Sequence, residues 1–174
     1  MDKDYQDEIT GLSFKSDRDF VRTGKSGDIS PEFDIVDSSF GRLFRNLRYF
    51  PQGRKNCYTL KPEQGKNNNY LIEAYFKYGN YDGKNQAPKF DLYLGVHYWA
   101  TVQLDSSEDS TYFVAVHFSP TDVIFVCLVN TGSGIPFISA LELRSLNNSI
   151  YKTDSGFAGV LARFDVGNNV AAAR

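Results

Sequence analysis

The sequence predicts an all-β fold, a two-sheet jelly-roll-like sandwich, and three observations lead to this prediction. The chain is rich in aromatic residues, with 14 Phe, 11 Tyr and 1 Trp in 174 residues, and aromatic side chains favour strands. From residue 56 onward the sequence contains repeated runs of alternating apolar residues, the pattern of strands with a buried face. No segment shows a convincing 3.6-residue apolar period over about 11 positions, as a helix would. Short strands at short intervals, without helices between them, are typical of a sandwich or barrel.

One face of each expected strand forms an apolar row. The rows are Tyr70, Ile72, Ala74, Phe76 and Tyr78; Phe90, Leu92, Leu94 and Val96; Tyr112, Val114, Val116 and Phe118; and Val123, Phe125, Cys127 and Val129. Residues 137–143 and 160–166 complete the set, and turn residues separate the strands. The run 123–129 is apolar on both faces, which predicts a central strand covered on both sides.

The first third of the chain is rich in turn residues. Residues 7–20 are expected to form a loop, in which residues 16–19 open a short helical turn through a side-chain cap. Residues 23–27 are expected to form a second loop. With no internal repeat and no long linker, one domain is the simplest interpretation.

Two cysteines, Cys57 and Cys127, allow two interpretations. Both can be buried free thiols. Alternatively, Cys127 alternates with apolar neighbours, and a disulfide forms if Cys57 lies on a facing strand in an oxidising compartment. The sequence leaves both alternatives open.

Charge and hydropathy exclude several classes of partner. The formal net charge is −2, and without a basic tract we expect no nucleic-acid partner. No run of about 18 apolar residues is present, so we expect no membrane segment in this chain. The start, Met1 to Asp4, is charged and lacks the apolar stretch of a signal peptide. Taken literally, such a chain stays in the cytosol.

No catalytic pattern emerges, so we expect no enzyme, no cofactor and no metal site. His97 and His117 each stand alone in a strand pattern, with no second ligand at metal spacing. The sequence has no Gly-x-Ser-x-Gly nucleophile elbow. The carboxylates Asp105, Glu108 and Asp109 lie in a polar loop without the apolar surroundings that a glycosidase acid needs.

Three long stretches carry a resemblance to a known family. They are LRYFPQGRKNCY at 47–58, the segment from YLI at 70–72 through YGNYDG at 78–83 to FDLYLG at 90–95, and VCLVNTG at 126–132 with PFISALELR at 136–144. Over about residues 5–167 the sequence resembles the malectin-like ectodomain of plant receptor-like kinases. The resemblance implies a jelly-roll sandwich related to carbohydrate-binding modules, on the extracellular side of the plasma membrane. It also implies a non-catalytic, ligand-binding role.

Such ectodomains usually hold two malectin modules, and this chain resembles the first. We therefore expect a single malectin-like domain over residues 1–167, from which an N-terminal strand is missing, and a divergent tail over residues 168–174. The expected product is a truncated receptor region. The ligand class that the resemblance implies is a carbohydrate or a secreted peptide, and a second malectin module or a co-receptor is a further expected partner. The alternative is a structural scaffold module without a small-ligand pocket.

The loop 78–83 is the candidate ligand site. Tyr78, Tyr81 and Asp82 could form a sugar platform, with ring faces stacked on C–H surfaces and the carboxylate accepting hydroxyl hydrogen bonds. The other interpretation is a tight connection in which the glycines supply positive φ and Asp82 caps the turn. Turn chemistry explains each residue and is favoured. The pocket aspartate of animal malectin aligns near Gly134 here, so that acceptor is absent.

Two further residues complete the candidate sites. Trp99 follows the strand ending at Val96 and either stacks on a ligand or packs into the core, the interpretation that we favour. Asn147 begins the sequence Asn-Asn-Ser, an N-glycosylation sequon that is used only if the chain is secreted.

Overall fold

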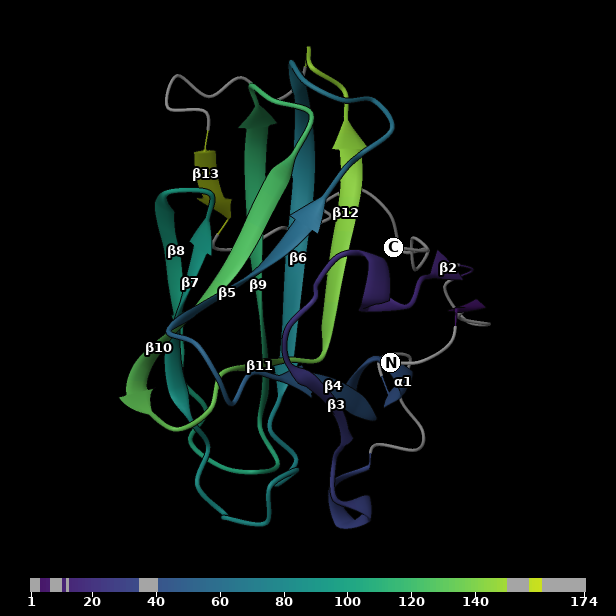
Figure 1. Cartoon of the computed structure of the whole chain (residues 1–174). Coiled ribbons are helices and arrows are strands. Elements are labelled where there is room, and N and C mark those ends of the chain that lie inside the picture. The colour runs from purple at the N-terminus through teal and green to yellow at the C-terminus, as the bar shows by residue number, and fades with distance from the viewer. Residues whose placement is uncertain (1–3, 7–10, 12, 35–40, 150–156, 161–174) are drawn as a thin grey trace.

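The computed structural model describes residues 4–6, 11, 13–34, 41–149 and 157–160 (Figure 1). The N-terminal third forms short elements. These are β1 (Tyr5–Gln6), β2 (Ser13–Phe14), the 3-10 helices η1 (Asp17–Asp19) and η2 (Pro31–Phe33), β3 (Lys25–Asp28), α1 (Gly41–Phe44) and β4 (Asn46–Tyr49). No helix in the described ranges is long and apolar enough to cross a membrane.

The remaining described residues form strands and the loops between them. The strands are β5 (Lys55–Leu60), β6 (Asn68–Lys77), β7 (Lys89–Leu94), β8 (His97–Val102), β9 (Ser110–Ser119), β10 (Ile124–Ser133), β11 (Phe137–Ile138), β12 (Ala140–Leu146) and β13 (Phe157–Val160). The strand expected over residues 160–166 is described only at residue 160, where β13 ends. The domain boundary expected at residue 167 lies outside the described residues.

Two four-stranded antiparallel sheets face each other, which confirms the predicted all-β sandwich. The sheet nearer the viewer in Figure 1, here called the front sheet, has the order β5-β10-β7-β8, and the back sheet has the order β12-β6-β9-β13. The chain crosses between the sheets repeatedly, for example from β5 to β6 and from β9 to β10. Two smaller sheets, β11-β4-β3 and β1-β2, complete the fold.

Aromatic rings fill the space between the two sheets. Phe76 of the back sheet, Phe90 of the front sheet and Phe137 of β11 are fully buried, and their ring centroids lie 5.7–6.2 Å apart. The predicted row from Tyr70 to Tyr78 is entirely buried. These interlocking rings hold the two sheets together through burial and edge-to-face contacts.

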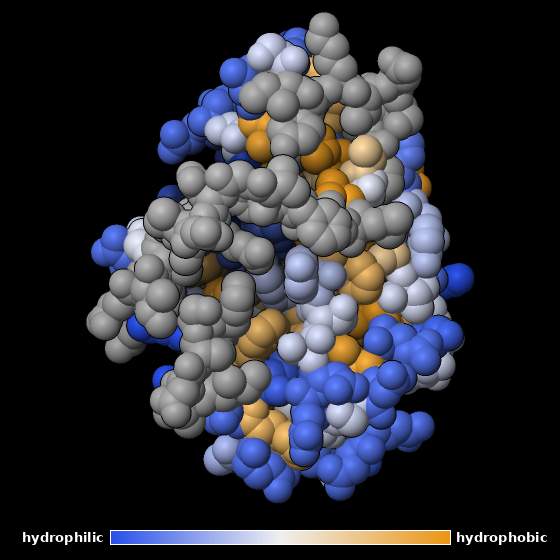
Figure 2. All heavy atoms as spheres, turned by 180° about the vertical axis from the view of Figure 1, so that it is seen from behind, coloured by the Kyte–Doolittle hydropathy of each residue, from blue (hydrophilic) through white to orange (hydrophobic). Residues whose placement is uncertain are grey.

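The back sheet carries apolar residues on its outer face as well. The row that begins at Tyr112 points outward: Val114 and Val116 pack with Leu71 in a separate cluster, whereas Ala115 belongs to the core between the sheets. From behind, Figure 2 shows apolar residues in the middle of the molecule, beside and between the grey segments.

Several local expectations are corrected. Val96 does not belong to the strand before it, because β7 ends at Leu94 and Val96 is 84% exposed in the turn to β8. Trp99 accordingly lies within β8 and not at the end of the preceding strand. The central strand β10 does lie between β5 and β7, but its outer face is only partly covered, since Cys127 is buried there whereas Phe125 is 45% exposed.

The N-terminal loops also differ from expectation. The helical turn at Asp17–Asp19 is present, but Ser16 makes no side-chain cap hydrogen bond. Part of the second expected loop is strand β3, which pairs with β4 through contacts such as Lys25 opposite Tyr49. Pairing with a neighbouring strand outweighs the turn propensity of residues 25–27.

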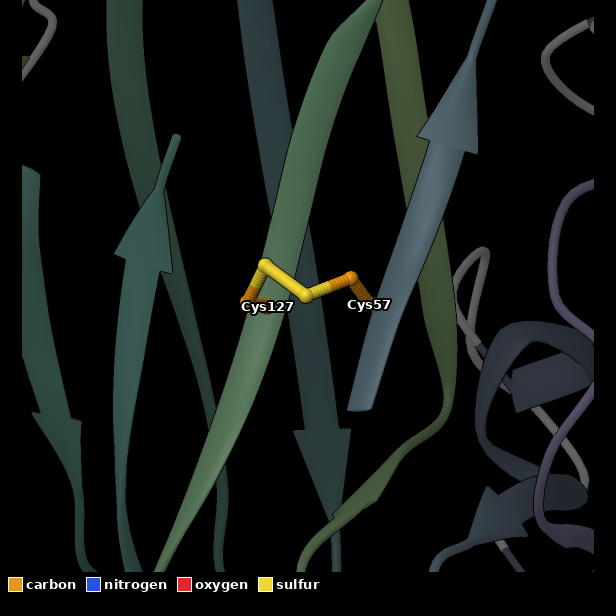
Figure 3. The surroundings of a disulfide bond; sticks show 2 residues. All are labelled: Cys57 and Cys127. Carbon is orange, nitrogen blue, oxygen red and sulfur yellow. A yellow bond between two sulfur atoms is a disulfide. The ribbon is translucent and has the colours of Figure 1, made fainter. Parts of the chain in front are cut away.

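A disulfide joins Cys57 to Cys127 (Figure 3). The two residues are direct partners on the neighbouring strands β5 and β10, and their Cα atoms lie 4.0 Å apart. The bond therefore lies within the front sheet and does not join two facing sheets. It closes a loop across 70 positions of sequence, which restricts the unfolded chain.

We predict that the Cys57→Ala/Cys127→Ala double variant loses about 4 kcal/mol of unfolding free energy, the value that chain-entropy arguments give for a loop of this length. Urea denaturation followed by circular dichroism measures the loss. Reduction of the disulfide in the wild-type protein should lower the urea midpoint as much as the double substitution does. Equal midpoints for the oxidised wild type and the double variant would contradict the prediction.

Candidate functional site

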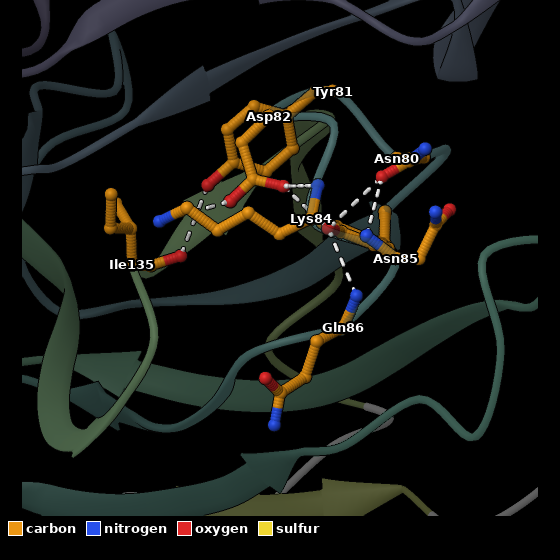
Figure 4. Close-up of polar contacts among 8 residues, drawn as sticks. Asn80, Tyr81, Asp82, Lys84, Asn85, Gln86 and Ile135 are labelled. Carbon is orange, nitrogen blue, oxygen red and sulfur yellow. Dashed lines mark hydrogen bonds and ion pairs between the residues drawn. The ribbon is translucent and has the colours of Figure 1, made fainter.

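The Tyr78 hydroxyl forms hydrogen bonds inside the candidate loop, with Asp82 and Gln86, which are labelled in Figure 4. The side chain is fully buried, and its hydroxyl donates to Asp82 Oδ1 at 2.5 Å and accepts the backbone N–H of Gln86 at 3.3 Å. Burial, followed by the hydrogen bond to Asp82, raises the pKa of Tyr78 to about 12. This hydroxyl is therefore committed to contacts within the protein.

Asp82 organises the same loop. Besides the Tyr78 hydroxyl it accepts the backbone N–H of Lys84 at 3.2 Å, and its other oxygen lies 3.8 Å from Lys84 Nζ. Asn80 supports the loop in the same way, since its Oδ1 accepts the backbone N–H of Asn85 at 2.8 Å. These are the contacts of the turn interpretation.

Tyr81 packs against the aromatic core. Its ring centroid lies 5.2 Å from that of Tyr49 and 5.7 Å from that of Phe137, and its hydroxyl donates to the carbonyl of Ile135 at 3.3 Å. Burial raises the pKa of Tyr81 above its ordinary value. Tyr81 is thus half-buried, and both its ring and its hydroxyl group make contacts within the protein.

Gly134, at the position near the malectin pocket aspartate, cannot carry a side chain without rearrangement. Its φ is +93°, and a Cβ built there would lie 2.6 Å from the Cβ of Pro88. Both the backbone conformation and the close approach require glycine. The missing carboxylate is therefore a consequence of the local packing.

The other candidate residues lie apart from this loop. Trp99 is half-buried in β8 and packs against the core between the sheets. Asn147 is exposed after β12, and its Oδ1 accepts the backbone N–H and the hydroxyl of Ser149 at 2.9 and 2.7 Å. The structure brings Tyr78, Tyr81 and Asp82 together, and their role as ligand-binding residues stays a prediction.

A cavity of about 300 Å³ lies elsewhere, at the open side of the sandwich. It is bounded by β12 at the edge of the back sheet, β5 at the edge of the front sheet and the N-terminal segment from β2 to η1. In Figure 1 the purple N-terminal segment lies beside β12. Apolar side chains dominate the wall, among them Phe14, Phe20, Leu60, Leu141 and Leu143. Mostly apolar walls with a few polar groups are typical of ligand sites.

Charged groups at the cavity fall into paired and unpaired sets. Asp17 is buried and bound by Arg48, with Nη2 at 2.7 Å from Oδ1, and by the Tyr58 hydroxyl at 3.0 Å. Arg144 donates to Glu142 at 2.5 Å. Burial raises the pKa of Glu142, and Arg144 opposes that shift.

Lys15 and Lys61 complete the charged lining of the cavity. Both are exposed, and neither has an ion-pair partner in the described part of the chain. No sequence pattern pointed to these two lysines or to the β12 residues as parts of a site. The apolar residues of 137–143 predicted a strand, but nothing in them indicated that this strand would lie at a sheet edge.

The outer face of the front sheet presents a second surface. Of the large hydrophobic residues that are exposed in the described chain, Val96, Tyr98 and Phe125 lie at the end of this sheet where β7 turns into β8. Tyr98 packs edge-on against Tyr93 at 5.8 Å. Lys55 Nζ lies 5.7 Å from the same Tyr93 ring.

The sequence matches one family model and several plant receptor-like kinases. A family model described as "Malectin-like domain" matches residues 1–174. A putative leucine-rich repeat receptor-like protein kinase of Arabidopsis thaliana is 42% identical over 166 residues, which cover 95% of this chain and 19% of the relative. A receptor-like protein kinase of the same plant is 46% identical over 152 residues, covering 87% and 16%. The chain thus spans about a fifth of the length of these relatives.

Solved structures share the fold at low identity. The ANX2 ectodomain from Arabidopsis thaliana has a TM-score of 0.71 and 12% identity, over 84% of this chain and 40% of that chain. A chain in the crystal structure of the plant peptide RALF23 in complex with FER and LLG2 has a TM-score of 0.68 and 14% identity, over 84% and 47%.

We predict that Tyr78→Phe lowers the unfolding free energy by about 1–3 kcal/mol, because the partly buried Asp82 carboxylate loses a charge-assisted hydrogen bond and the Gln86 N–H loses its acceptor. Urea denaturation measures the change. Tyr112→Phe is the matched control, since Tyr112 is 57% exposed and its hydroxyl should contribute little. A Tyr78→Phe variant as stable as the wild type would show that the loop does not depend on this hydroxyl.

Proposed function

The chain belongs to the malectin-like domain family, as its resemblance indicated, and on this premise we propose that it is a non-catalytic ligand-binding module of a receptor-like kinase ectodomain. The cavity beside β12 carries the proposal. It combines apolar walls with a small set of charged groups, the composition typical of a ligand site.

Two polar side chains of the kind that an enzyme could use, Asp109 and Lys77, serve structural roles. Asp109 Oδ2 accepts the backbone N–H groups of Asp105 and Ser106 at 3.1 and 2.9 Å. Lys77 Nζ donates to the carbonyl of Glu108 at 2.7 Å. These contacts stabilise the loop between β8 and β9 and support a binding role over a catalytic one.

Between the two ligand classes, the geometry argues against a sugar platform in the 78–83 loop. A sugar platform needs exposed ring faces and a free carboxylate. Tyr78 is buried, and Asp82 already accepts two hydrogen bonds. The RALF23 complex supports peptide or co-receptor partners by analogy with a protein of the same fold.

We expect Ser13→Trp to weaken ligand binding at least about tenfold, because an indole at this exposed position of β2 would fill the cavity that Ser13 lines. Arrays of cell-wall oligosaccharides and of secreted plant peptides, followed by calorimetry on each hit, measure the effect. Ser110→Trp is the control, since Ser110 is also an exposed strand serine but does not line the cavity. Equal affinities of the two variants for every hit would overturn the cavity as the ligand site.

A scaffold module is the second candidate function. The exposed Val96, Tyr98 and Phe125 on the front sheet favour it, because clustered exposed apolar groups mark protein contacts. In that case Phe125→Ser, and not Ser13→Trp, would abolish binding to a second malectin module or a co-receptor.

We further propose that the module lies on the extracellular side of the plasma membrane. Asn147 is exposed directly after β12, as attachment of a glycan requires. Expression in a secretory plant host should give a protein whose mass falls on deglycosylation, and Asn147→Gln should remove that difference. Asn148→Gln is the control because it keeps the sequon. Secreted wild-type protein without a glycan would contradict the proposed use of Asn147.

A further inference from the structure

Consecutive residues of β12 line the cavity, and this shows where the cavity lies relative to the back sheet. Ala140, Leu141, Glu142, Leu143 and Arg144 all line it. Successive side chains of a strand point to opposite faces of the sheet. Neighbours of both orientations can border one cavity only if it lies beside the strand, along the edge of the sheet. The cavity is therefore a groove along the edge of β12, and we call it the β12 groove.

The edge of β12 that borders this groove has no strand partner in the described ranges. β12 is the terminal strand of the back sheet and pairs with β6 alone, from Ala140 opposite Tyr75 to Leu146 opposite Asn69. Every second residue of an edge strand turns its N–H and C=O groups away from the sheet. The groove is thus bordered by a regular row of backbone donors and acceptors.

The opposite wall offers contacts for side chains. Phe14 and Phe20 come from the N-terminal segment and Leu60 comes from the end of β5. An extended peptide beside β12 would place every second side chain towards this wall, where these apolar groups would cover it. An extended peptide has backbone groups at the same spacing as those along β12, so it can pair with the whole row. A compact ligand would contact only part of the row.

Charge adds a preference for one kind of peptide. On the β12 side, Arg144 is shared between Glu142 at 2.5 Å and Glu73 at 3.9 Å, and Asp17 is held by Arg48. Lys15 and Lys61 line the groove from other elements and have no such counter-charge among the described residues. An acidic side chain on the bound peptide would complete this pairing.

We propose that the β12 groove binds an extended, acidic peptide segment by strand addition, so that the peptide becomes a further strand of the back sheet. This inference rests on the proposed ligand-binding function and specifies how the ligand is held. Backbone hydrogen bonds to β12 supply affinity, alternate side chains contact the apolar wall, and Lys15 and Lys61 select a carboxylate.

The test uses a displayed library of random heptapeptides, selected on the whole chain and counter-selected on the Ser13→Trp variant. We expect enriched peptides to combine β-branched residues at alternate positions with at least one acidic residue. Each enriched peptide is then synthesised with a single N-methyl group at every position in turn. Strand addition predicts that methylation weakens binding about tenfold or more at alternate positions and has little effect between them, since only every second N–H faces β12.

Hydrogen exchange gives an independent readout on the protein. On peptide binding, alternate amides within residues 140–146 should slow, and the amides that already bond to β6 should not change. Lys15→Glu/Lys61→Glu should weaken the acidic peptides about tenfold and reduce the salt dependence of binding. Lys89→Glu, an exposed lysine on β7 outside the groove, should leave binding within about twofold.

The possible outcomes separate the two levels of the proposal. Peptides that bind in the groove without an alternating methylation pattern would overturn strand addition. A second outcome is that no peptide is enriched, but oligosaccharides bind the wild-type chain and bind Ser13→Trp more weakly. That result would overturn the peptide as the ligand and keep the ligand-binding function of the groove. If neither peptides nor oligosaccharides bind the wild-type chain in a manner sensitive to Ser13→Trp, both this inference and the proposed site fail.

Discussion

Burial of aromatic rings between two sheets is the constraint on which the rest of this structure depends. Phe76, Phe90 and Phe137 come from the back sheet, the front sheet and the short strand β11, and each ring touches the other two. Rings of this size bury large apolar areas and resist substitution by smaller groups. The positions of the strands, and hence of every loop between them, follow from the need to close the sheets over these rings.

The same constraint limits the exposure of the two tyrosines in the 78–83 loop. Phe137 also contacts Tyr78 and Tyr81, so the tyrosines that resemble a sugar platform are drawn into the rim of the core. Once Tyr78 is buried, its hydroxyl needs a partner, and Asp82 supplies one at 2.5 Å. A residue pattern that suits a ligand thus also suits a turn attached to a core, and the packing decides between the two.

The proposed recognition site lies instead where the sandwich is incompletely closed. Each sheet of a sandwich has two edges, and an edge strand leaves backbone groups without partners. At one side the edges β5 and β12 approach the N-terminal segment and leave the cavity. The front sheet, stapled by the disulfide between Cys57 and Cys127, presents its exposed aromatic residues on a different face. The two candidate interaction surfaces are therefore separate, and substitutions can address them one at a time.

The sequence by itself determined the fold class, because alternation of apolar residues along 70–78 or 90–94 is a local property that shows which side chains are buried. It also determined the family, through long runs such as residues 47–58. Only the tertiary structure decided that Cys57 pairs with Cys127 within one sheet, that Val96 lies in a turn, and that β12 lies at an edge. Strand order and cross-strand register depend on contacts between residues far apart in the chain, so the groove formed by Lys15, Lys61 and β12 has no local signature.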